Sequence, residues 1–235
     1  MHIGSCTDGK KRGQKPMGKV KIEWSANFAY IVGIIASDGC LQKNNSIVSV
    51  TSKDIEVVEN IKKTFKLSNK IGIKVSKFAH QGHCYVIQFG DVLFCRFLNS
   101  IGIYPNKSKT IGNIAVPAEF FFDFLRGHFD GDGCAYSYFD KRWKSSFMFY
   151  ISIVSASPPF IDGIRLIIQG HLGIKGHLTR AKESTLVQLR YAKREAVILA
   201  SKMYENNPEL YLIRKRLKIN GILSTIASTS QKRDG

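Results

Sequence analysis

The chain has 235 residues and a mass of 26.4 kDa, which is enough for one or two domains with a full hydrophobic core. It is 44% hydrophobic and 11% aromatic, so its composition excludes an intrinsically disordered protein. Its 35 Lys and Arg residues outnumber its 18 Asp and Glu residues, giving a net charge of +17 and a pI near 9.7. This excess predicts an acidic partner, of which nucleic acid is the commonest.

Targeting and cysteine patterns predict an intracellular protein. No apolar run approaches the roughly 20 residues that span a bilayer, so no membrane association is expected. The N-terminus is polar and basic and does not resemble a secretory signal. The five cysteines include no C-x-x-C pair and are odd in number, which favours free thiols in a reducing compartment over disulfides or structural zinc. Prokaryotic cytoplasm and an organelle both fit.

The chain contains an internal repeat that begins after a basic leader, residues 1–24, which we expect to be flexible. Residues 30–40 match residues 124–134, and four positions recur 94 residues later: Gly33, Asp38, Gly39 and Cys40 return as Gly127, Asp132, Gly133 and Cys134. Both matching stretches have helical character and end in Asp-Gly-Cys.

Each copy is followed by the same predicted elements. A strand (46–51; 150–155) precedes a helix with a start signal, Ser52 in the first copy and Ser157 with Pro158 in the second. Each copy continues with a short stretch (71–75; 172–175) and an alternating strand (86–89; 187–190). It ends with a closing helix (92–101; 195–204). The second copy has extra residues around 140–146. We therefore predict two αββαββα repeats, 25–112 and 113–223, and a disordered tail, 224–235.

The repeated helices predict a metal site. Gly33 and Ser37, like Gly127 and Gly131, lie four residues apart and give each helix a face of small residues. Two such faces allow close packing, which would bring the helix C-termini, and with them Asp38 and Asp132, together. Carboxylates are disfavoured at helix C-termini and repel one another unless cations lie between them. Hard oxygen ligands of this kind suit Mg²⁺.

The two motif copies, Ile31–Gly39 and Leu125–Gly133, resemble those of the LAGLIDADG homing endonucleases, specifically the single-chain type with two motifs. The resemblance covers roughly residues 25–222. It implies an α+β fold in which two pseudo-symmetric repeats pack through their motif helices and their sheets form a DNA-binding saddle. It also implies a monomer that cuts a long double-stranded DNA site across the minor groove, leaving short 3′ overhangs, with Mg²⁺ or a substitute such as Mn²⁺.

The resemblance assigns roles by position. Asp38 and Asp132 would be the catalytic, metal-binding carboxylates, and Ser37 and Gly131 would contribute backbone carbonyls to the metal. Lys107 and Lys215 lie where the family carries basic residues that assist cleavage. The two copies depart from one another at the position occupied by Ala36 and Asp130. Two further residues of the second copy are bulkier than usual, namely Arg126 and His128.

Strand alternation predicts which side chains face DNA. Ile71, Ile73 and Val75 should face the helices and Lys74 should face outward; Val187 and Leu189 should likewise face inward. Outward polar side chains on strands can reach base edges in the major groove. The candidates on the strands and their turns are Gln42, Lys43, Asn44, Ser46, Ser49, Lys74, Lys77, Gln88, Tyr136, Tyr138, Lys141, Arg142, Lys144, Thr179, Arg180, Lys182, Gln188 and Arg190. The resemblance adds Lys109 and Arg214, which lie in the family's basic region after the last helix of each half.

Two other functions fit the same motifs. One is a non-cleaving descendant of the fold, either a DNA-binding regulator or a maturase that binds intron RNA, although both acids are present. The other is the endonuclease portion of an intein. The chain has neither Cys nor Ser at residue 1 and no terminal His-Asn, so we do not expect it to splice itself.

Overall fold

Each half of the chain folds into a four-stranded antiparallel sheet with helices on one face, in a computed structural model that describes residues 18–75, 82–143, 146–180 and 185–231. The elements of the first half are α1 (Ala26–Asp38), β1 (Gly39–Leu41), β2 (Ile47–Ser52), α2 (Ile55–Thr64), β3 (Gly72–Val75), β4 (His83–Gly90) and α3 (Val92–Ser100). Short 3-10 helices at Lys107–Lys109 and Ala118–Phe120 lead into the second half.

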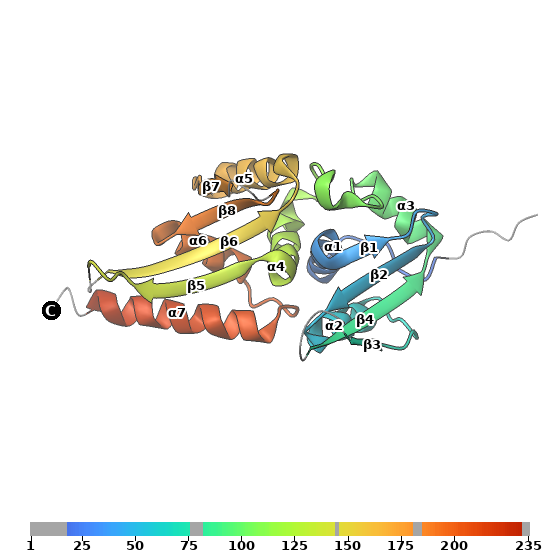
Figure 1. Ribbon diagram of the computed structural model, residues 1–235, viewed down its shortest axis with the longest axis horizontal. Coiled ribbons are helices and arrows are strands. Elements are labelled where there is room, and N and C mark those ends of the chain that lie inside the picture. Colours follow the sequence, from blue (N-terminus) through green and yellow to red (C-terminus); the bar gives the residue numbers. More distant parts are fainter. Residues whose placement is uncertain (1–17, 76–81, 144–145, 181–184, 232–235) are drawn as a thin grey trace, which may run out of the picture.

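The second half repeats this order and adds a final helix. Its elements are α4 (Phe121–Asp132), β5 (Cys134–Phe139), β6 (Phe147–Ser155), α5 (Pro158–Leu172), β7 (His177–Arg180), β8 (Val187–Ala192), α6 (Arg194–Met203) and α7 (Ile213–Gln231). The strand orders β1-β2-β4-β3 and β5-β6-β8-β7 are equivalent. The two sheets lie on either side of the paired helices α1 and α4 (Figure 1). The expected α+β fold of two similar repeats is confirmed.

Helix α1 is buried on all sides because it packs against its own sheet and against α4. Every residue from Phe28 to Ala36 is buried. A helix that is apolar all round is the pattern expected at the centre of a fold. The hydroxyl of Ser25 accepts a hydrogen bond from the Phe28 backbone N–H, 3.2 Å away, and so caps the first turn.

The expected position of the third strand in the second copy was wrong. The second copy of the third strand is not at 172–175, because α5 continues to Leu172 and ends at Gly173, whose φ of 67° suits a glycine C-cap. The strand instead occupies His177–Arg180. The extra residues of the second copy mostly lengthen its first hairpin, since β5 and β6 have 6 and 9 residues where β1 and β2 have 3 and 6.

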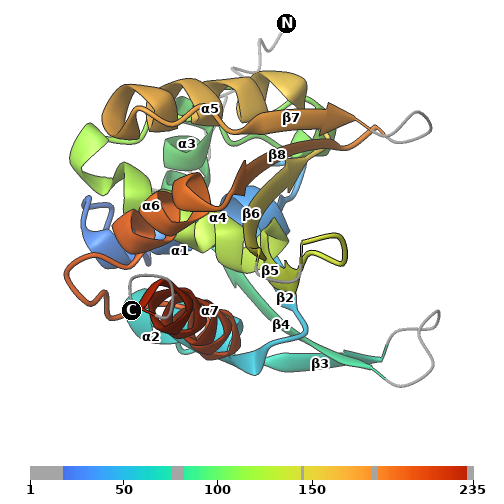
Figure 2. The ribbon, with the colours of Figure 1, turned by 90° about the vertical axis from the view of Figure 1, so that its left-hand side faces the viewer.

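The expectation that Ile73 and Val75 face the core was also wrong. Their exposed fractions are 63% and 72%. Strand β3 is an edge strand paired only with β4, and its far end projects beyond the helices, so neither of its faces is covered there (Figure 2). Val187 and Leu189 are buried as expected.

The predicted cap residues stand at or next to the helix starts without capping them. Helix α2 begins after Asp54, and the hydroxyl of Ser52 accepts from the Asp54 backbone N–H at 3.2 Å. Helix α5 begins after Ser157, with Pro158 in its first turn as expected, but the Ser157 hydroxyl donates to the Ile111 carbonyl. Neither Asp54 nor Ser157 forms a side-chain cap with its own helix.

The ends of the described chain are more ordered than the sequence suggested. Residues 1–17 of the leader lie outside the described residues, but Val20 is buried, and the Asp91 carboxylate accepts from the backbone N–H of Lys19 and of Val20 at 2.5 and 2.8 Å. Residues 224–231 belong to α7 rather than to a disordered tail. None of the described helices is long and apolar enough to cross a membrane.

Helix α7 has a signal in the sequence that the tail prediction overlooked. Lys215, Ile219 and Ile222 are buried and are spaced by four and three residues, which is one face of a helix. This face packs beside β5 and supports the longer hairpin of the second sheet (Figure 1). The N-terminal end of α7 meets α2 of the first half through Arg214 and Asp54 (Figure 2).

Candidate active site

The motif helices α1 and α4 touch through their backbones at two glycines. A Cβ atom at Gly33 would lie 2.1 Å from the Phe124 carbonyl oxygen, and one at Gly127 would lie 2.0 Å from the Tyr30 carbonyl oxygen. Both distances are far below van der Waals contact, so only glycine fits at either position. The small-residue faces therefore pack helix against helix as the repeat predicted.

This packing brings the two acidic helix ends together. Asp38 is the last residue of α1, and Asp132 is the last residue of α4. A Cβ atom at Gly131 would lie 2.0 Å from the Ser37 hydroxyl and 3.1 Å from Oδ2 of Asp38. The Asp38 carboxylate thus lies against the last turn of α4, directly beside the residue that precedes Asp132.

The environment disfavours the charged form of both acids. Burial, followed by repulsion from Asp132, raises the pKa of Asp38 to about 6, although Lys215 and Lys107 oppose the rise. Burial also raises the pKa of Asp132, against the attraction of the same two lysines. Paired carboxyl groups in this state gain stability from a cation placed between them.

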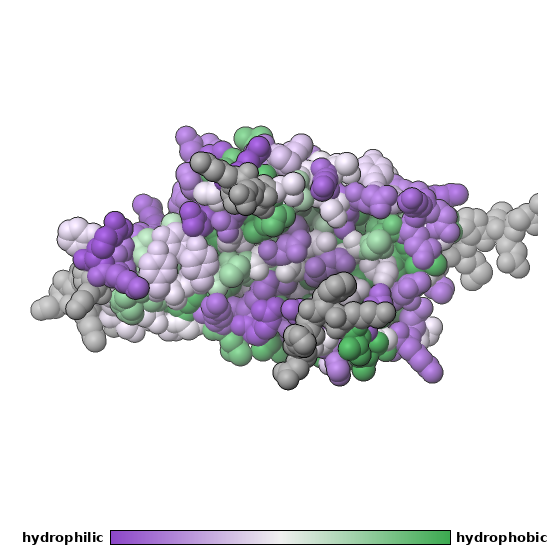
Figure 3. All heavy atoms as spheres, viewed as in Figure 1, coloured by the Kyte–Doolittle hydropathy of each residue, from purple (hydrophilic) through white to green (hydrophobic). Residues whose placement is uncertain are grey.

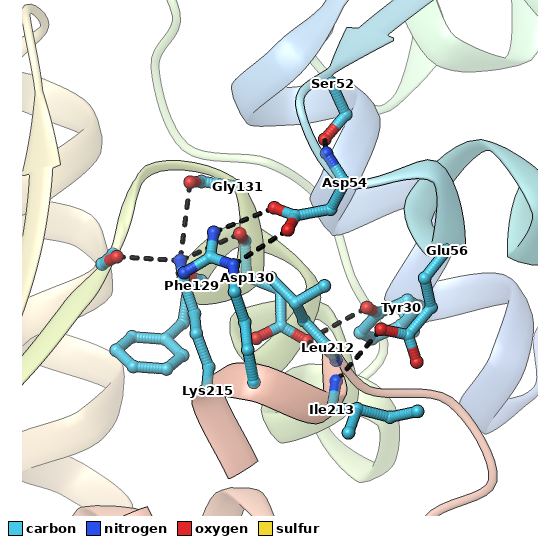
Figure 4. A network of polar contacts seen from close by, with 12 residues as sticks. Tyr30, Ser52, Asp54, Glu56, Phe129, Asp130, Gly131, Leu212, Ile213 and Lys215 are labelled. Atoms are coloured by element: carbon cyan, nitrogen blue, oxygen red, sulfur yellow. Dashed lines mark hydrogen bonds and ion pairs between the residues drawn. The ribbon is translucent and has the colours of Figure 1, made fainter. Parts of the chain in front are cut away.

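A buried lysine stands at each of these helix ends. The Lys107 ammonium donates to the Gly39 carbonyl at the end of α1. The Lys215 ammonium donates to the carbonyls of Phe129, Asp130 and Gly133 at the end of α4, at 2.6, 2.8 and 2.7 Å (Figure 4). Their exposed fractions are only 6% and 7%. A cation at a helix C-terminus is favoured by the helix dipole.

Burial lowers the pKa of both lysines. The nearby Asp132 and Asp38 oppose this change for Lys107, and Asp130 opposes it most for Lys215. Two lysines and two aspartates with shifted pKa values at one point of the molecule are typical of a functional site. The sequence placed these four residues in equivalent positions of the repeats, and the structure brings them together.

The donor set at the helix ends fits a hard divalent cation. Carboxylate and carbonyl oxygens are the ligands that Mg²⁺ prefers. Within the described ranges there is no cluster of three or more His, Cys, Asp or Glu residues, and the carboxylates at this point are those of Asp38 and Asp132. The Gly131 carbonyl also receives a long contact, 3.4 Å, from the Lys215 ammonium.

Two departures of the second motif, Arg126 and Asp130, belong to a buried polar network. Asp130 Oδ2 accepts from the Tyr30 hydroxyl of α1 at 2.9 Å and from the Leu212 backbone N–H at 2.7 Å. Arg126 donates to carbonyls that precede α7, and its guanidinium lies 5.5 Å from the centre of the Tyr30 ring. These residues connect the helix interface to the segment that carries Lys215, so they are structural partners of the site.

Equivalent rows of side chains run across the two sheets next to the acids. In the first sheet Cys40 lies opposite Ser49, which lies opposite Gln88. In the second sheet Cys134 lies opposite Ser152, which lies opposite Arg190. Cys40, Cys134 and Ser152 are not among the predicted site residues. The position of each cysteine directly after Asp-Gly, and the alternation along 147–155, would have identified them.

The second sheet also carries an aromatic cluster without a counterpart among the paired residues of the first. The rings of Tyr136 and Tyr138 stack on Tyr150 at centroid distances of 5.0 and 5.9 Å. Arg190 lies 5.5 Å from the Tyr150 ring and donates to the Tyr136 hydroxyl at 3.3 Å. Tyr150 is a further residue that the sequence analysis missed.

The remaining candidates for DNA contact fall into three groups. Most are exposed or half-buried on the sheets and their turns, and hydrophilic side chains gather over the centre of this face (Figure 3). Arg214 forms a bidentate ion pair with Asp54, with both distances 2.8 Å. Three lie outside the described residues: Lys77, Lys144 and Lys182.

Part of the second half resembles a known protein family. Residues 119–204 match the family described as LAGLIDADG-like domain. The chain is 30% identical over 190 residues to the probable translation initiation factor IF-2 of Thermococcus kodakarensis, which is 75% of this chain and 15% of that protein. It is 26% identical over 191 residues to the DNA-directed RNA polymerase subunit Rpo1C of Methanocaldococcus jannaschii, which is 79% of this chain and 20% of the subunit. The chain thus spans a small part of these relatives.

Solved structures show the same fold at low sequence identity. The LAGLIDADG meganuclease I-AabMI bound to uncleaved DNA is 14% identical with a TM-score of 0.59, covering 86% of this chain and 91% of its own. The LAGLIDADG homing endonuclease I-LtrWI bound to target DNA is 14% identical with a TM-score of 0.58, covering 88% and 91%. I-DmoI in complex with DNA and Mn is 13% identical with a TM-score of 0.50, covering 77% and 97%. Residues 119–204 thus match a LAGLIDADG-like domain, and the chain has the fold of these LAGLIDADG endonucleases.

Proposed function

We propose that this protein is a site-specific endonuclease that makes a double-strand break in DNA. The observation that carries the proposal is the pairing of two helix-terminal carboxyl groups, Asp38 and Asp132, each with a buried lysine beside it. Two equivalent sets of one acid and one lysine suit a reaction performed twice, once on each strand. The excess of 17 positive charges suits a polyanionic partner.

Each residue has a role in this proposal. Asp38 and Asp132, with the carbonyls of Ser37 and Gly131, would hold Mg²⁺ or Mn²⁺. A bound divalent cation supplies an activated water and stabilises charge on the leaving oxygen of a phosphodiester. Lys107 and Lys215 keep positive charge beside the acids and would neutralise the phosphate as charge develops on it.

The two sheets would bind the DNA duplex on their polar face. The outward residues include neutral hydrogen-bonding groups in the first sheet, such as Gln88, and the cation Arg190 in the second. Side chains of this kind on antiparallel strands can read base edges in the major groove. Cleavage across the minor groove with short 3′ overhangs belongs to the same proposal, because the paired acids lie between the sheets.

The test is selection of a cleaved site from a randomised duplex library with Mg²⁺. We expect one long site to be cut, and the Asp38→Asn and Asp132→Asn variants to lose about 10³-fold in double-strand cleavage while still binding the selected duplex. The matched control is Gly221→Ala in α7, where the added methyl group meets open space. It controls for the effects of producing and purifying a variant protein.

Other results would assign the alternatives. Tight DNA binding by the wild type without cleavage under Mg²⁺ or Mn²⁺ would indicate a regulator of the same fold. Preference for structured RNA over duplex DNA would indicate a maturase. Wild-type cleavage that survives both aspartate substitutions would show that the reaction occurs elsewhere in the protein.

The relatives favour one biological setting. Three quarters or more of this chain aligns with each of two proteins that have different names, and the aligned part is only 15% and 20% of them. This distribution suits an element inserted into larger proteins, such as the endonuclease portion of an intein. The expected target is then a gene lacking the insert. Cleavage of an uninterrupted IF-2 or RNA polymerase gene fragment, with no cleavage of the interrupted one, would support this setting, and equal cleavage of both would contradict it.

A further inference from the structure

We propose that each lysine of the candidate site is held in place by the opposite half of the molecule, through the residue that precedes a helix in that half. These residues are Asp54, before α2 in the first half, and Ser157, before α5 in the second. The inference concerns the lysines of the proposed endonuclease site, so its importance for catalysis rests on the proposed function. The experiment that tests it does not require DNA cleavage.

The two residues occupy the same position in the repeats. The Asp54 backbone N–H donates to the Ser52 hydroxyl at 3.2 Å, and the Ser157 backbone N–H donates to the Ser155 hydroxyl at 3.1 Å. Each therefore follows the same two-residue turn at the end of the second strand of its sheet. Both stand where a side chain normally caps a helix, and neither caps its own. A missing cap leaves helix N–H groups without that partner, which is a cost to the fold.

The side chains bond to the opposite half instead. Asp54 forms the bidentate ion pair with Arg214, the residue directly before Lys215 (Figure 4). Ser157 donates to the carbonyl of Ile111, and the Ile111 backbone N–H in turn donates to the Lys107 carbonyl at 2.8 Å. The first half thus holds the Lys215 segment, and the second half holds the Lys107 segment.

The contacts that hold the Lys215 segment are more extensive than those that hold the Lys107 segment. Besides the ion pair from Asp54, Glu56 of the first half accepts from the Ile213 backbone N–H at 3.0 Å. Asp130 accepts from Leu212, so three consecutive residues before Lys215 are bonded to acids (Figure 4). Charged and bidentate hydrogen bonds are stronger than neutral ones, but solvent screens the Asp54 ion pair because the Arg214 side chain is 60% exposed, so this segment owes its hold to several bonds together. The contact described for the Lys107 segment is the single neutral hydroxyl of Ser157.

Reciprocal bracing would make each lysine depend on correct docking of the two halves. A half that separated or rotated would release the lysine of its partner, so an imperfect interface would leave both sites incomplete. Asp54 and Ser157 are positioning residues in this proposal, since they contact the lysine-bearing segments and not the reacting atoms.

The experiment measures the reactivity of individual lysines in Asp54→Ala and Ser157→Ala. Each folded protein, checked by thermal unfolding, is treated with an amine-acylating reagent, and the rate of labelling at Lys107 and Lys215 is read by peptide mass spectrometry. In the wild type both lysines should react far more slowly than the exposed Lys43. Because the effects are read as a ratio within one molecule, each lysine is the control for the other.

We expect Asp54→Ala to raise labelling of Lys215 about tenfold while Lys107 changes less than about twofold. Ser157→Ala should do the reverse, raising Lys107 by about threefold and sparing Lys215. Arg214→Gln removes the same ion pair from its other side and should reproduce Asp54→Ala if that variant fails to fold. Equal changes at both lysines, or no change at either, would overturn the proposal.

Strand-specific nicking gives a second readout. On a selected duplex with differently labelled strands, Asp54→Ala and Ser157→Ala should each slow mainly one strand, and the two variants should slow opposite strands. A slowing of the same strand by both would contradict reciprocal bracing. If the wild type cuts no DNA, the proposed function fails and the lysine labelling still decides this inference.

Discussion

The two motif helices share one face and differ on another. The glycines of α1 and α4 meet in equivalent contacts, yet Val32 and Ala36 of α1 correspond to Arg126 and Asp130 of α4, and all four are buried. The shared face determines how the halves dock. The other face differs because the two helices pack against different segments of the chain.

The polar face of α4 supports a stretch of chain between α6 and α7. Arg126 donates to the carbonyls of Leu210 and Met203 at 2.9 and 2.8 Å and to the Asp123 carboxylate at 2.8 Å. Buried backbone groups outside regular structure need such partners. A repeated unit can therefore keep its interface while one copy acquires buried polar groups that hold the stretch leading to its lysine.

The largest expected effect tests this difference. Arg126→Met should lower the free energy of unfolding by about 3–5 kcal/mol, because the backbone carbonyls and Asp123 lose a buried cation. Val32→Ala at the equivalent position of α1 should cost about 1–3 kcal/mol, since it removes only apolar contacts. Urea unfolding monitored by circular dichroism measures both. Equal costs would show that the polar network contributes no more than packing.

The next effect tests the shared face. Gly33→Ala and Gly127→Ala should each destabilise the protein by about 3 kcal/mol, since the added methyl meets a backbone carbonyl that cannot move aside. The matched control is Gly221→Ala, where nothing lies within 4 Å and where alanine should stabilise the helix by about 0.5–1 kcal/mol. Tolerance of one glycine substitution but not the other would contradict equivalent packing.

A smaller effect tests the electrostatics at the helix ends. The folded-state pKa of Asp38, about 6, lies above the ordinary 3.8, so this group favours the folded state at low pH and loses that contribution as the pH rises through 6. Asp38→Asn should therefore make the unfolding free energy less dependent on pH between about 4 and 7, and should stabilise the protein at pH 7 by about 1–2 kcal/mol.

The control for this prediction is Asp162→Asn, at an exposed position of α5. It measures the general effect of replacing an aspartate away from the helix ends. The same wild-type protein should cut DNA faster as the pH rises through 6, because cation binding needs the ionised carboxylate. A pH profile of stability that is identical for Asp38→Asn and wild type would contradict the raised pKa.

The smallest effect compares the two sheets. DNA affinity should fall steeply with salt, with each neutralised phosphate adding about 0.9 to the slope of log K against log salt. Arg190→Gln in the second sheet should reduce the slope by up to about 0.9, whereas Gln88→Ala, at the equivalent position of the first sheet, should leave it unchanged. Fluorescence anisotropy across a salt series measures this. Equal slopes for both variants and wild type would show that Arg190 contacts no phosphate.

Local features of the sequence predicted most of the fold and the centre of the site. Three of these features depend only on neighbours along the chain: the repeat, the small residues four positions apart and the Asp-Gly helix ends. They predicted the helices α1 and α4 and the positions of Asp38 and Asp132. Strand alternation placed Val187 and Leu189 correctly because β8 lies inside its sheet. It failed for Ile73 and Val75, since an edge strand can extend beyond the layer that covers it.

The sequence by itself therefore determined two similar halves and a pair of acids that must meet where their helices pack. Only the tertiary structure decided the surroundings of those acids. It alone shows that Lys107 and Lys215 are buried against helix ends, that Asp54 and Ser157 bond across to the opposite half, and that α7 supports the longer hairpin. The physical reason is that these contacts join residues 46 to 160 positions apart. A hydrogen bond between residues so far apart produces no periodic pattern or fixed spacing in the sequence.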